Sequence, residues 1–143
     1  MTSSIVAILH TDGASKGNPG PAGAGFVLTD PQGNVIVARG VPLGVTTVGV
    51  AEYKALIAGL SEALSRGITR ISVYSDSQFM CRQLQGIYQV RTPAIRPLYE
   101  WAVKLRDRFE SFEVCHVGRE FNDEADRLAG EAAKRSAEEA GRP

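Results

Sequence analysis

Four acidic residues occur at positions where their carboxylates could act together. Asp12 and Asp76 each end an apolar segment that is typical of a buried strand. Glu52 lies in the first turn of a segment with helical apolar spacing, and Asp126 lies beside the apolar face of another. Carboxylates gathered at a core edge repel one another, and a divalent cation removes that penalty. Oxygen ligands of this kind select Mg²⁺ or Mn²⁺ over zinc.

Each acid also has an ordinary structural explanation. Asp12 precedes Gly13, as turn residues do, and Glu52 suits the dipole of a helix start. Asp76 is a good N-cap for the segment that follows it, and Asp126 suits a solvated helix face. Taken singly, these explanations are the commoner ones. A shared position at one sheet edge favours a joint site instead.

The elements that must position these acids follow from apolar periodicity and turn residues. A Pro- and Gly-containing turn at 30–34 separates two of the strands, and a Gly-rich loop precedes the earlier one. The sequence predicts strands at 5–11, 25–29, 35–41, 68–75 and 112–117, and helices at 53–64, 77–85, 98–109 and 121–132.

This order predicts an α/β fold with a mixed five-stranded sheet, in which three antiparallel strands are followed by two parallel additions and helices cover both faces. If the strands ending at Asp12 and Asp76 are parallel neighbours, both carboxylates emerge at the carboxyl ends of strands, where ligand sites of such sheets lie. We expect one domain over 1–135, complete in itself, and a frayed tail over 136–143.

The composition narrows the function classes. The 143 residues contain 16 Lys+Arg and 16 Asp+Glu, so a protein that coats nucleic acid through a large basic excess is disfavoured. The two cysteines, Cys81 and Cys115, are too few for a disulfide framework, and we expect free buried thiols. No segment is typical of a signal peptide or a membrane span, so we expect a cytoplasmic monomer without a membrane partner.

Four sequence blocks resemble the type 1 ribonuclease H family and occur in the family's order. They are TDGASKGNPGP, AEYKAL, SDSQ and NDEADRLA, at 11–21, 51–56, 75–78 and 122–129. The resemblance implies the ribonuclease H-like fold and an endonuclease that cuts the RNA strand of RNA–DNA hybrids. It also implies that the four acids hold two Mg²⁺ or Mn²⁺ ions and that the products carry 5′-phosphate and 3′-hydroxyl ends.

The same resemblance assigns the remaining site residues. Glu52 suits a further contact with the ribose 2′-hydroxyl beside the cut. Arg119 stands where many members carry a mobile histidine, and it implies a phosphate contact that helps product departure. The implied substrate contacts are Gly13, Ser15, Lys16, Asn18, Thr47, Gln78 and Asn122.

The sequence departs from the family pattern in two places. Val48 and Gly49 stand where asparagines often read the minor groove, so part of that recognition is in question. A basic protrusion, which some members carry between their second and third helices, is absent because only 87–94 separates the two predicted helices. Trp101 lies on the apolar stripe of the second of these, and we expect it in the core.

Two other functions remain as alternatives. A catalytically weak hybrid-binding module would have lost at least one acid, and none is lost. A different nuclease or recombinase of the same fold, such as an integrase, would lack the Gly-Asn-Pro-Gly-Pro loop together with Ser-Asp-Ser-Gln. Fold alone does not decide between them.

Overall fold

The computed structural model of the chain describes residues 4–141. Its strands and helices follow one another in the predicted order, with one short 3₁₀ helix, η1, added before the last helix. The strands are β1 (Val6–Ser15), β2 (Gly20–Thr29), β3 (Val35–Thr46), β4 (Arg70–Ser75) and β5 (Ser111–His116). The helices are α1 (Val48–Ser65), α2 (Gln78–Leu84), α3 (Arg96–Arg106), η1 (Arg119–Phe121) and α4 (Asp123–Ala140).

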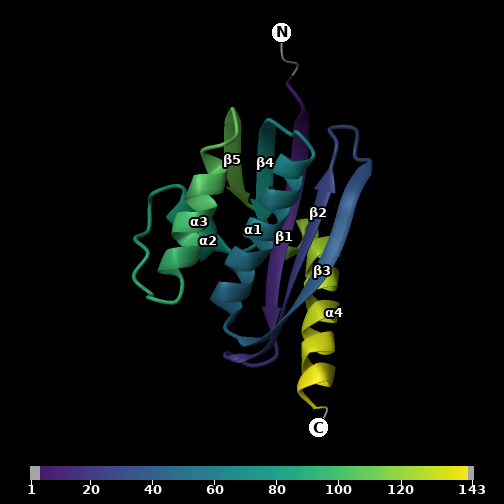
Figure 1. Cartoon of the computed structure of the whole chain (residues 1–143), viewed down its shortest axis with the longest axis vertical. Helices are drawn as coiled ribbons and strands as arrows, with labels where there is room; N and C mark the ends of the chain where they lie inside the picture. Colours follow the sequence, from purple (N-terminus) through teal and green to yellow (C-terminus); the bar gives the residue numbers. More distant parts are fainter. Residues whose placement is uncertain (1–3, 142–143) are drawn as a thin grey trace.

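The strands form one sheet in the order β3-β2-β1-β4-β5 (Figure 1). The first three are antiparallel neighbours, whereas β4 pairs parallel with both β1 and β5. Thr11 is the register partner of Ser75, so Asp12 and Asp76 follow paired residues on adjacent parallel strands. The predicted mixed five-stranded sheet is therefore confirmed.

Helices cover both faces of the sheet (Figure 1). On one face α1 packs against β1 and β2, and α3 packs against α1; on the other face α4 packs against β2, β3 and β1. The apolar core between α1 and the sheet contains fully buried Leu9, Leu56, Leu60 and Val73. This arrangement holds the start of α1 and the start of α4 on opposite sides of β1.

Two strands are longer than predicted. β2 begins at Gly20, so the glycine-rich segment expected to be a loop belongs to the sheet. β1 continues to Ser15, which places Asp12 inside the strand rather than at its end. The prediction was wrong because glycines were taken as loop residues, whereas here they allow close packing of α4 against β2.

Two expectations about α3 and the C-terminal segment are wrong. Trp101 is 53% exposed, because α3 buries the side of the helix that carries Ala102 and Leu105. The expected frayed tail is helical to Ala140, and residues 142–143 lie outside the described residues. Ser136 holds this extension in place, because its buried hydroxyl donates to the carbonyl of Ala22 at 2.7 Å.

The connection between α2 and α3 matters for function because some members of the family that the sequence resembles carry a basic protrusion at this place. Its residues, 85–95, are all described and form a loop without a helix, as predicted. Within residues 4–141, no helix combines the length and the apolar character that crossing a membrane requires.

Candidate active site

Asp12 is the most buried of the four predicted acids. It lies in the middle of the sheet, opposite Gly25 of β2, and is 5% exposed. Its Oδ1 accepts a hydrogen bond from the amide of Gly13 at 2.9 Å. Its Oδ2 is buried and has no hydrogen-bond partner among the described residues. A buried carboxylate oxygen without a partner is costly, so this atom is suited to receive a ligand.

The pKa of Asp12 is raised both by burial and by the neighbouring acids. Burial raises the pKa of the Asp12 carboxyl to about 9, and the neighbouring carboxyl groups of Asp126 and Asp76 add to the rise. The like charges of Asp76 and Asp126 thus act on a carboxyl that is already poorly hydrated. The structure therefore brings together three of the four predicted acids, from β1, the β4–α2 junction and α4.

Glu52 approaches the same place from α1. Burial raises the pKa of the Glu52 carboxyl, the Ser77 hydroxyl opposes that rise, and the charge of Asp76 adds to it. Ser77 rather than Asp76 caps α2, because its hydroxyl accepts from the amide of Met80 at 3.3 Å. Since the cap is supplied by Ser77, the carboxylate of Asp76 is free to face the other acids.

Two glycines set how closely the helices approach Asp12. A Cβ at Gly13 would lie 2.3 Å from the amide nitrogen of Glu52, and a Cβ at Gly25 would lie 2.4 Å from the carbonyl of Ala125. Both contacts are with backbone, so neither could be relieved by a side-chain movement. Gly13 is buried under α1. Gly13 therefore brings Glu52 close to Asp12, and its expected contact with substrate stays a prediction.

Arg119 lies at the rim of the acid cluster. Its Nε is 3.4 Å from Oδ2 of Asp76, and its side chain is 74% exposed. The charge of Asp126, together with the contact with Asp76, raises the pKa of the guanidinium above its ordinary value. Arg119 is thus a fixed positive charge between the acids and solvent, where an anionic ligand would enter.

The donor chemistry at this cluster fits a hard divalent cation. The candidate ligands are all carboxylate oxygens, which is the set that Mg²⁺ and Mn²⁺ prefer. Among residues 4–141, no three His, Cys, Asp or Glu side chains already stand close enough to hold one ion by themselves. The partnerless Oδ2 of Asp12 and the mutual repulsion of the acids are nevertheless what a bound cation would relieve.

A hollow of about 260 Å³ lies beside Glu52 and gathers two further predicted residues, Asn18 and Thr47. Asn18 Oδ1 accepts from the amide of Val48 at 3.0 Å, and Thr47 caps α1 through the amide of Val50. Gly49 lines the same hollow, so the space left by the missing asparagine side chain is open. The hollow is a candidate place for the substrate strand next to Glu52.

The remaining predicted contacts divide into exposed and internal residues. Lys16 and Gln78 are exposed, and Ser15 is half-buried with its hydroxyl donating to the carbonyl of Thr46 at 3.2 Å. Asn122 is only 2% exposed and donates to the carbonyl of Thr11 at 2.9 Å. The side chain of Asn122 thus fastens the start of α4 to β1, and its expected contact with substrate stays a prediction.

Aromatic residues also lie around this site, and none of them was predicted from the sequence. Phe79, 64% exposed, follows Gln78 at the start of α2 and lines the hollow beside Glu52. Its ring lies 5.4 Å from that of Tyr88, on the loop between α2 and α3. A large apolar residue directly after the Ser-Asp-Ser-Gln block is the signal by which Phe79 could have been found.

Comparisons with known proteins agree with this geometry. Residues 10–132 match the family described as reverse transcriptase-like. Ribonuclease HI of Halobacterium salinarum is 40% identical over 123 residues, which cover 86% of this chain. The N-terminal ribonuclease H domain of Mycobacterium tuberculosis Rv2228c superposes with a TM-score of 0.94 at 37% identity, covering 96% of this chain and 100% of that one.

A third similar structure is LC11-RNase H1 in complex with an RNA/DNA hybrid, with a TM-score of 0.87 at 35% identity over 92% of this chain and 99% of that one. The chain spans 62% of the length of the halobacterial relative and 37% of the bifunctional mycobacterial protein. The family match covers most of the sequence, and the acids of its four motifs gather at one place in the fold. The chain therefore belongs to the type 1 ribonuclease H family.

Proposed function

We propose that this chain is an endonuclease that hydrolyses the RNA strand of RNA–DNA hybrids and leaves 5′-phosphate and 3′-hydroxyl ends. The observation that carries the proposal is the convergence of Asp12, Asp76 and Asp126, which contributes to raising the pKa of Asp12 to about 9. Glu52 completes the set from α1. The complex of LC11-RNase H1 with an RNA/DNA hybrid supports the substrate class.

In this proposal the four acids hold two Mg²⁺ or Mn²⁺ ions. The bound cations would activate a water for in-line attack and stabilise the leaving 3′ oxygen. Asp12 positions its partnerless oxygen from the rigid centre of the sheet, whereas Asp76 and Asp126 reach the same place from two helix starts. Because these backbones are fixed, the carboxylates keep their relative positions during the reaction.

The other residues bind and orient the substrate. Glu52 and the hollow lined by Asn18 and Thr47 would face the ribose 2′-hydroxyls of the RNA strand, which distinguishes RNA from DNA. Lys16 and Gln78 are exposed and add contacts with phosphate and base edges. Arg119 would bind a phosphate oxygen at the rim and help the cut strand leave. We also propose that the chain acts as a monomer in the cytoplasm.

One assay distinguishes this function from hybrid binding without cleavage and from integrase-like chemistry. An end-labelled RNA–DNA hybrid is incubated with the protein and Mg²⁺ or Mn²⁺, beside RNA–RNA and DNA–DNA duplexes of the same sequence. We expect internal cuts in the RNA of the hybrid only, and the fragments should be ligatable at their 5′-phosphates. Binding without cuts, or cuts in DNA, would reject the proposal.

A further inference from the structure

A buried hydrogen bond joins α1 to α2 directly beside Glu52. Tyr53, the residue that follows Glu52, is 2% exposed, and its hydroxyl donates to Oε1 of Gln83 at 2.6 Å. Gln83 lies near the end of α2 and is itself 5% exposed. The residues of α2 that belong to the same core, Met80 and Leu84, are apolar. Tyr53 and Gln83 are therefore a polar pair within an apolar core.

The stability of the fold does not require this polar pair. A buried hydrogen bond contributes little net free energy, because both partners give up hydrogen bonds with water, and apolar groups of the same shape in place of both partners are nearly neutral. What a hydrogen bond adds to an apolar contact is a defined distance and angle between the two groups. The pair is therefore suited to fix the geometry between α1 and α2.

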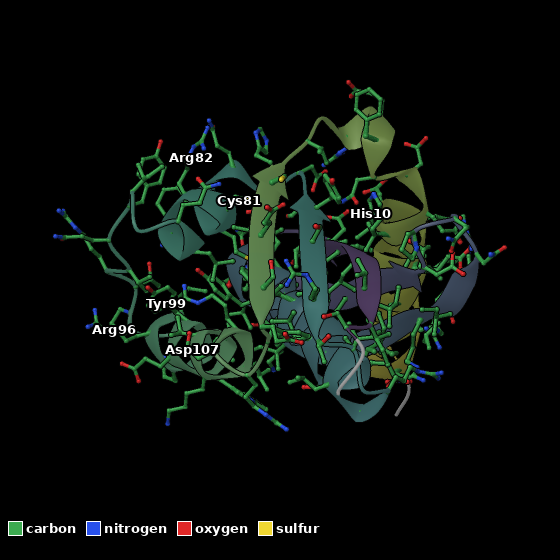
Figure 2. All side chains as sticks on the ribbon, turned by 90° about the horizontal axis from the view of Figure 1, so that it is seen from above. His10, Cys81, Arg82, Arg96, Tyr99 and Asp107 are labelled. Atoms are coloured by element: carbon green, nitrogen blue, oxygen red, sulfur yellow. The ribbon has the colours of Figure 1, made fainter. Side chains whose placement is uncertain are left out.

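The ring of Tyr53 is held in its orientation by α3. Its centroid lies 6.5 Å from that of Tyr99, and the two rings are nearly perpendicular at 81°, which is a favourable arrangement of aromatic rings. Figure 2 shows Tyr99 on α3, and Tyr99 lines a hollow together with Gln83. Burial raises the pKa of the Tyr53 hydroxyl above its ordinary value, so the hydroxyl stays protonated and remains the donor.

Hydrogen bonds at both ends of α2 connect this helix to α1. At its start, the hydroxyl of Ser77 forms a hydrogen bond with the carboxyl group of Glu52. Near its end, Gln83 accepts from Tyr53. α1 and α2 share few other contacts. Since Asp76 directly precedes Ser77, the position of α2 relative to α1 determines how far the carboxylate of Asp76 lies from that of Glu52.

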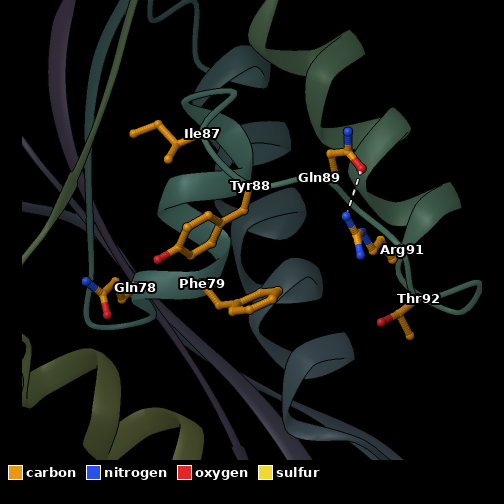
Figure 3. Close-up of a pocket in the computed structure, with 7 residues that line it drawn as sticks. All are labelled: Gln78, Phe79, Ile87, Tyr88, Gln89, Arg91 and Thr92. Atoms are coloured by element: carbon orange, nitrogen blue, oxygen red, sulfur yellow. Dashed lines mark hydrogen bonds between the residues drawn. The ribbon is translucent and has the colours of Figure 1, made fainter.

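The outer side of α2 provides no comparable connection to α1. Gln78 and Phe79 point from the first turn of α2 toward the loop that carries Tyr88 (Figure 3). Phe79 is 64% exposed. On its inner side α2 also packs against β5, which supports the helix without joining it to α1. The hydrogen bond between Tyr53 and Gln83 is therefore the connection that holds the far end of α2 to α1.

We propose that this hydrogen bond positions Glu52 relative to Asp76, which makes Tyr53 and Gln83 positioning residues of the site. Both act through the helices that carry them and not on the reacting atoms. Without the bond α2 would stay buried, but the separation of the two carboxylates would no longer be fixed. A misplacement of about 1 Å in a catalytic site can lower a rate by about 100-fold. The inference rests on the proposed function for the reaction and adds two residues to it.

The test separates positioning from stability by removing the two partners singly and together. Tyr53→Phe and Gln83→Met each leave one buried partner without its hydrogen bond, so each should lower the melting temperature by about 5 °C. The double variant Tyr53→Phe/Gln83→Met has apolar groups of similar shape at both positions and should regain most of that loss. In all three variants, kcat for hybrid RNA should stay at least about tenfold below wild type, with KM changed by less than about twofold.

Tyr99→Phe is the matched control, because it removes a hydroxyl from the neighbouring ring and leaves the bond between Tyr53 and Gln83 in place. It should cleave as wild type does. A double variant that regains both melting temperature and kcat would overturn the proposal, since the pair would then be structural only. A raised KM with an unchanged kcat would also overturn it. If the double variant does not fold, a kcat of Tyr53→Phe equal to that of Tyr99→Phe rejects the proposal.

A measurement of metal binding without substrate separates this inference from the proposed function. In a calorimetric titration with Mn²⁺, the double variant should bind about tenfold more weakly than wild type and Tyr99→Phe, because residues that orient metal ligands affect affinity to this extent. If wild type cleaves hybrid RNA and the variants match it in cleavage and in Mn²⁺ binding, the inference fails alone. If no hybrid is cleaved but the variants bind Mn²⁺ more weakly, the positioning role stands and the proposed function fails.

Discussion

Gly13 and Glu52 are packed so closely that a Cβ on the first would lie 2.3 Å from the amide nitrogen of the second. The contact joins β1 to α1 directly beside Asp12. It means that the distance between two of the four acids is set by the absence of a side chain. The glycine after Asp12, which the sequence offered as a substrate contact, is therefore a structural requirement of the site.

Gly13→Ala should consequently lower both the stability of the fold and the rate of hybrid cleavage. Overpacking against backbone costs about 1–3 kcal/mol, and the displacement of α1 moves Glu52 away from the other acids. We expect a lower melting temperature and a hybrid-cleavage rate reduced by at least about tenfold, since small displacements of catalytic groups are costly.

Gly130→Ala is the control for that variant, because nothing lies within 4 Å of a Cβ at this position in α4. It should stabilise the helix by up to about 1 kcal/mol and leave cleavage unchanged. Normal activity of Gly13→Ala would show that the close approach of α1 is not needed.

The metal-free protein should become less stable as the pH rises. The pKa of Asp12 is raised from 3.8 to about 9 in the folded state, so between these values the folded state binds more protons than the unfolded state. The contribution of Asp12 to the free energy of unfolding is therefore fully present below about pH 4 and is lost as the pH rises toward 9. The raised pKa of Glu52 acts in the same direction.

Urea unfolding in EDTA at several pH values measures this effect. Asp12→Asn keeps the shape of the side chain and cannot ionise, so the variant should be more stable than wild type at pH 7 by at least about 1 kcal/mol. This lower bound is smaller than the free energy that corresponds to a shift of one pKa unit. Added Mg²⁺ should stabilise wild type and not the variant. A variant less stable than wild type in EDTA at pH 7 would argue against repulsion at Asp12.

Arg119→Ala should reduce kcat more than it raises KM. The side chain lies at the exposed rim and pairs with Asp76, so its loss removes a phosphate contact during departure rather than the acid cluster itself. We expect kcat to fall by about tenfold and Arg119→Lys to restore part of it. A higher KM with an unchanged kcat would make Arg119 an ordinary substrate contact.

Substrate affinity should be weak and only shallowly dependent on salt. The chain lacks a basic protrusion, and binding weakens with salt in proportion to the number of phosphates contacted. Asparagines at 48 and 49 should lower KM by about fivefold for each amide that forms a hydrogen bond, without a change of salt slope, because amides release no counterions.

The structure permits the asparagine variants, since a Cβ at Gly49 would make only an ordinary contact with Ile95 at 3.4 Å. Val35→Asn is the control, because it adds an amide to a valine that is 61% exposed at the start of β3. Measuring KM at several salt concentrations checks both effects. A low KM of the unmodified protein that rises steeply with salt concentration would show that another basic surface replaces the protrusion.

The sequence was sufficient for the fold, because its elements have strong periodicity and clear turns. Prediction from the sequence was less reliable for residue types that occur in two structural roles, such as glycine in loops and in closely packed strands. Gly23 and Gly25 belong to a strand because α4 packs where their side chains would be, and Asn122 is buried because it fastens α4 to β1. Neither role is visible without the packing of α4, which joins residues more than one hundred positions apart.

The positions of Asp12 and Asp76 were predictable because they depend on local sequence patterns and not on the packing of α4. Asp12 and Asp76 follow paired strand residues, so local patterns combined with one parallel pairing placed both at the same point. The exposed ring pair of Phe79 and Tyr88 was not predictable, because the loop that carries Tyr88 has no periodicity.

Cleavage of an RNA–DNA hybrid by Asp76→Asn tests the central claim most directly. Asp107→Asn is its matched control, because it removes the same charge at a position 67% exposed at the end of α3. The account predicts that Asp76→Asn loses cleavage in Mg²⁺ and Mn²⁺ by orders of magnitude while folding normally, and that Asp107→Asn cleaves as wild type does. Near-normal cleavage by Asp76→Asn would contradict it.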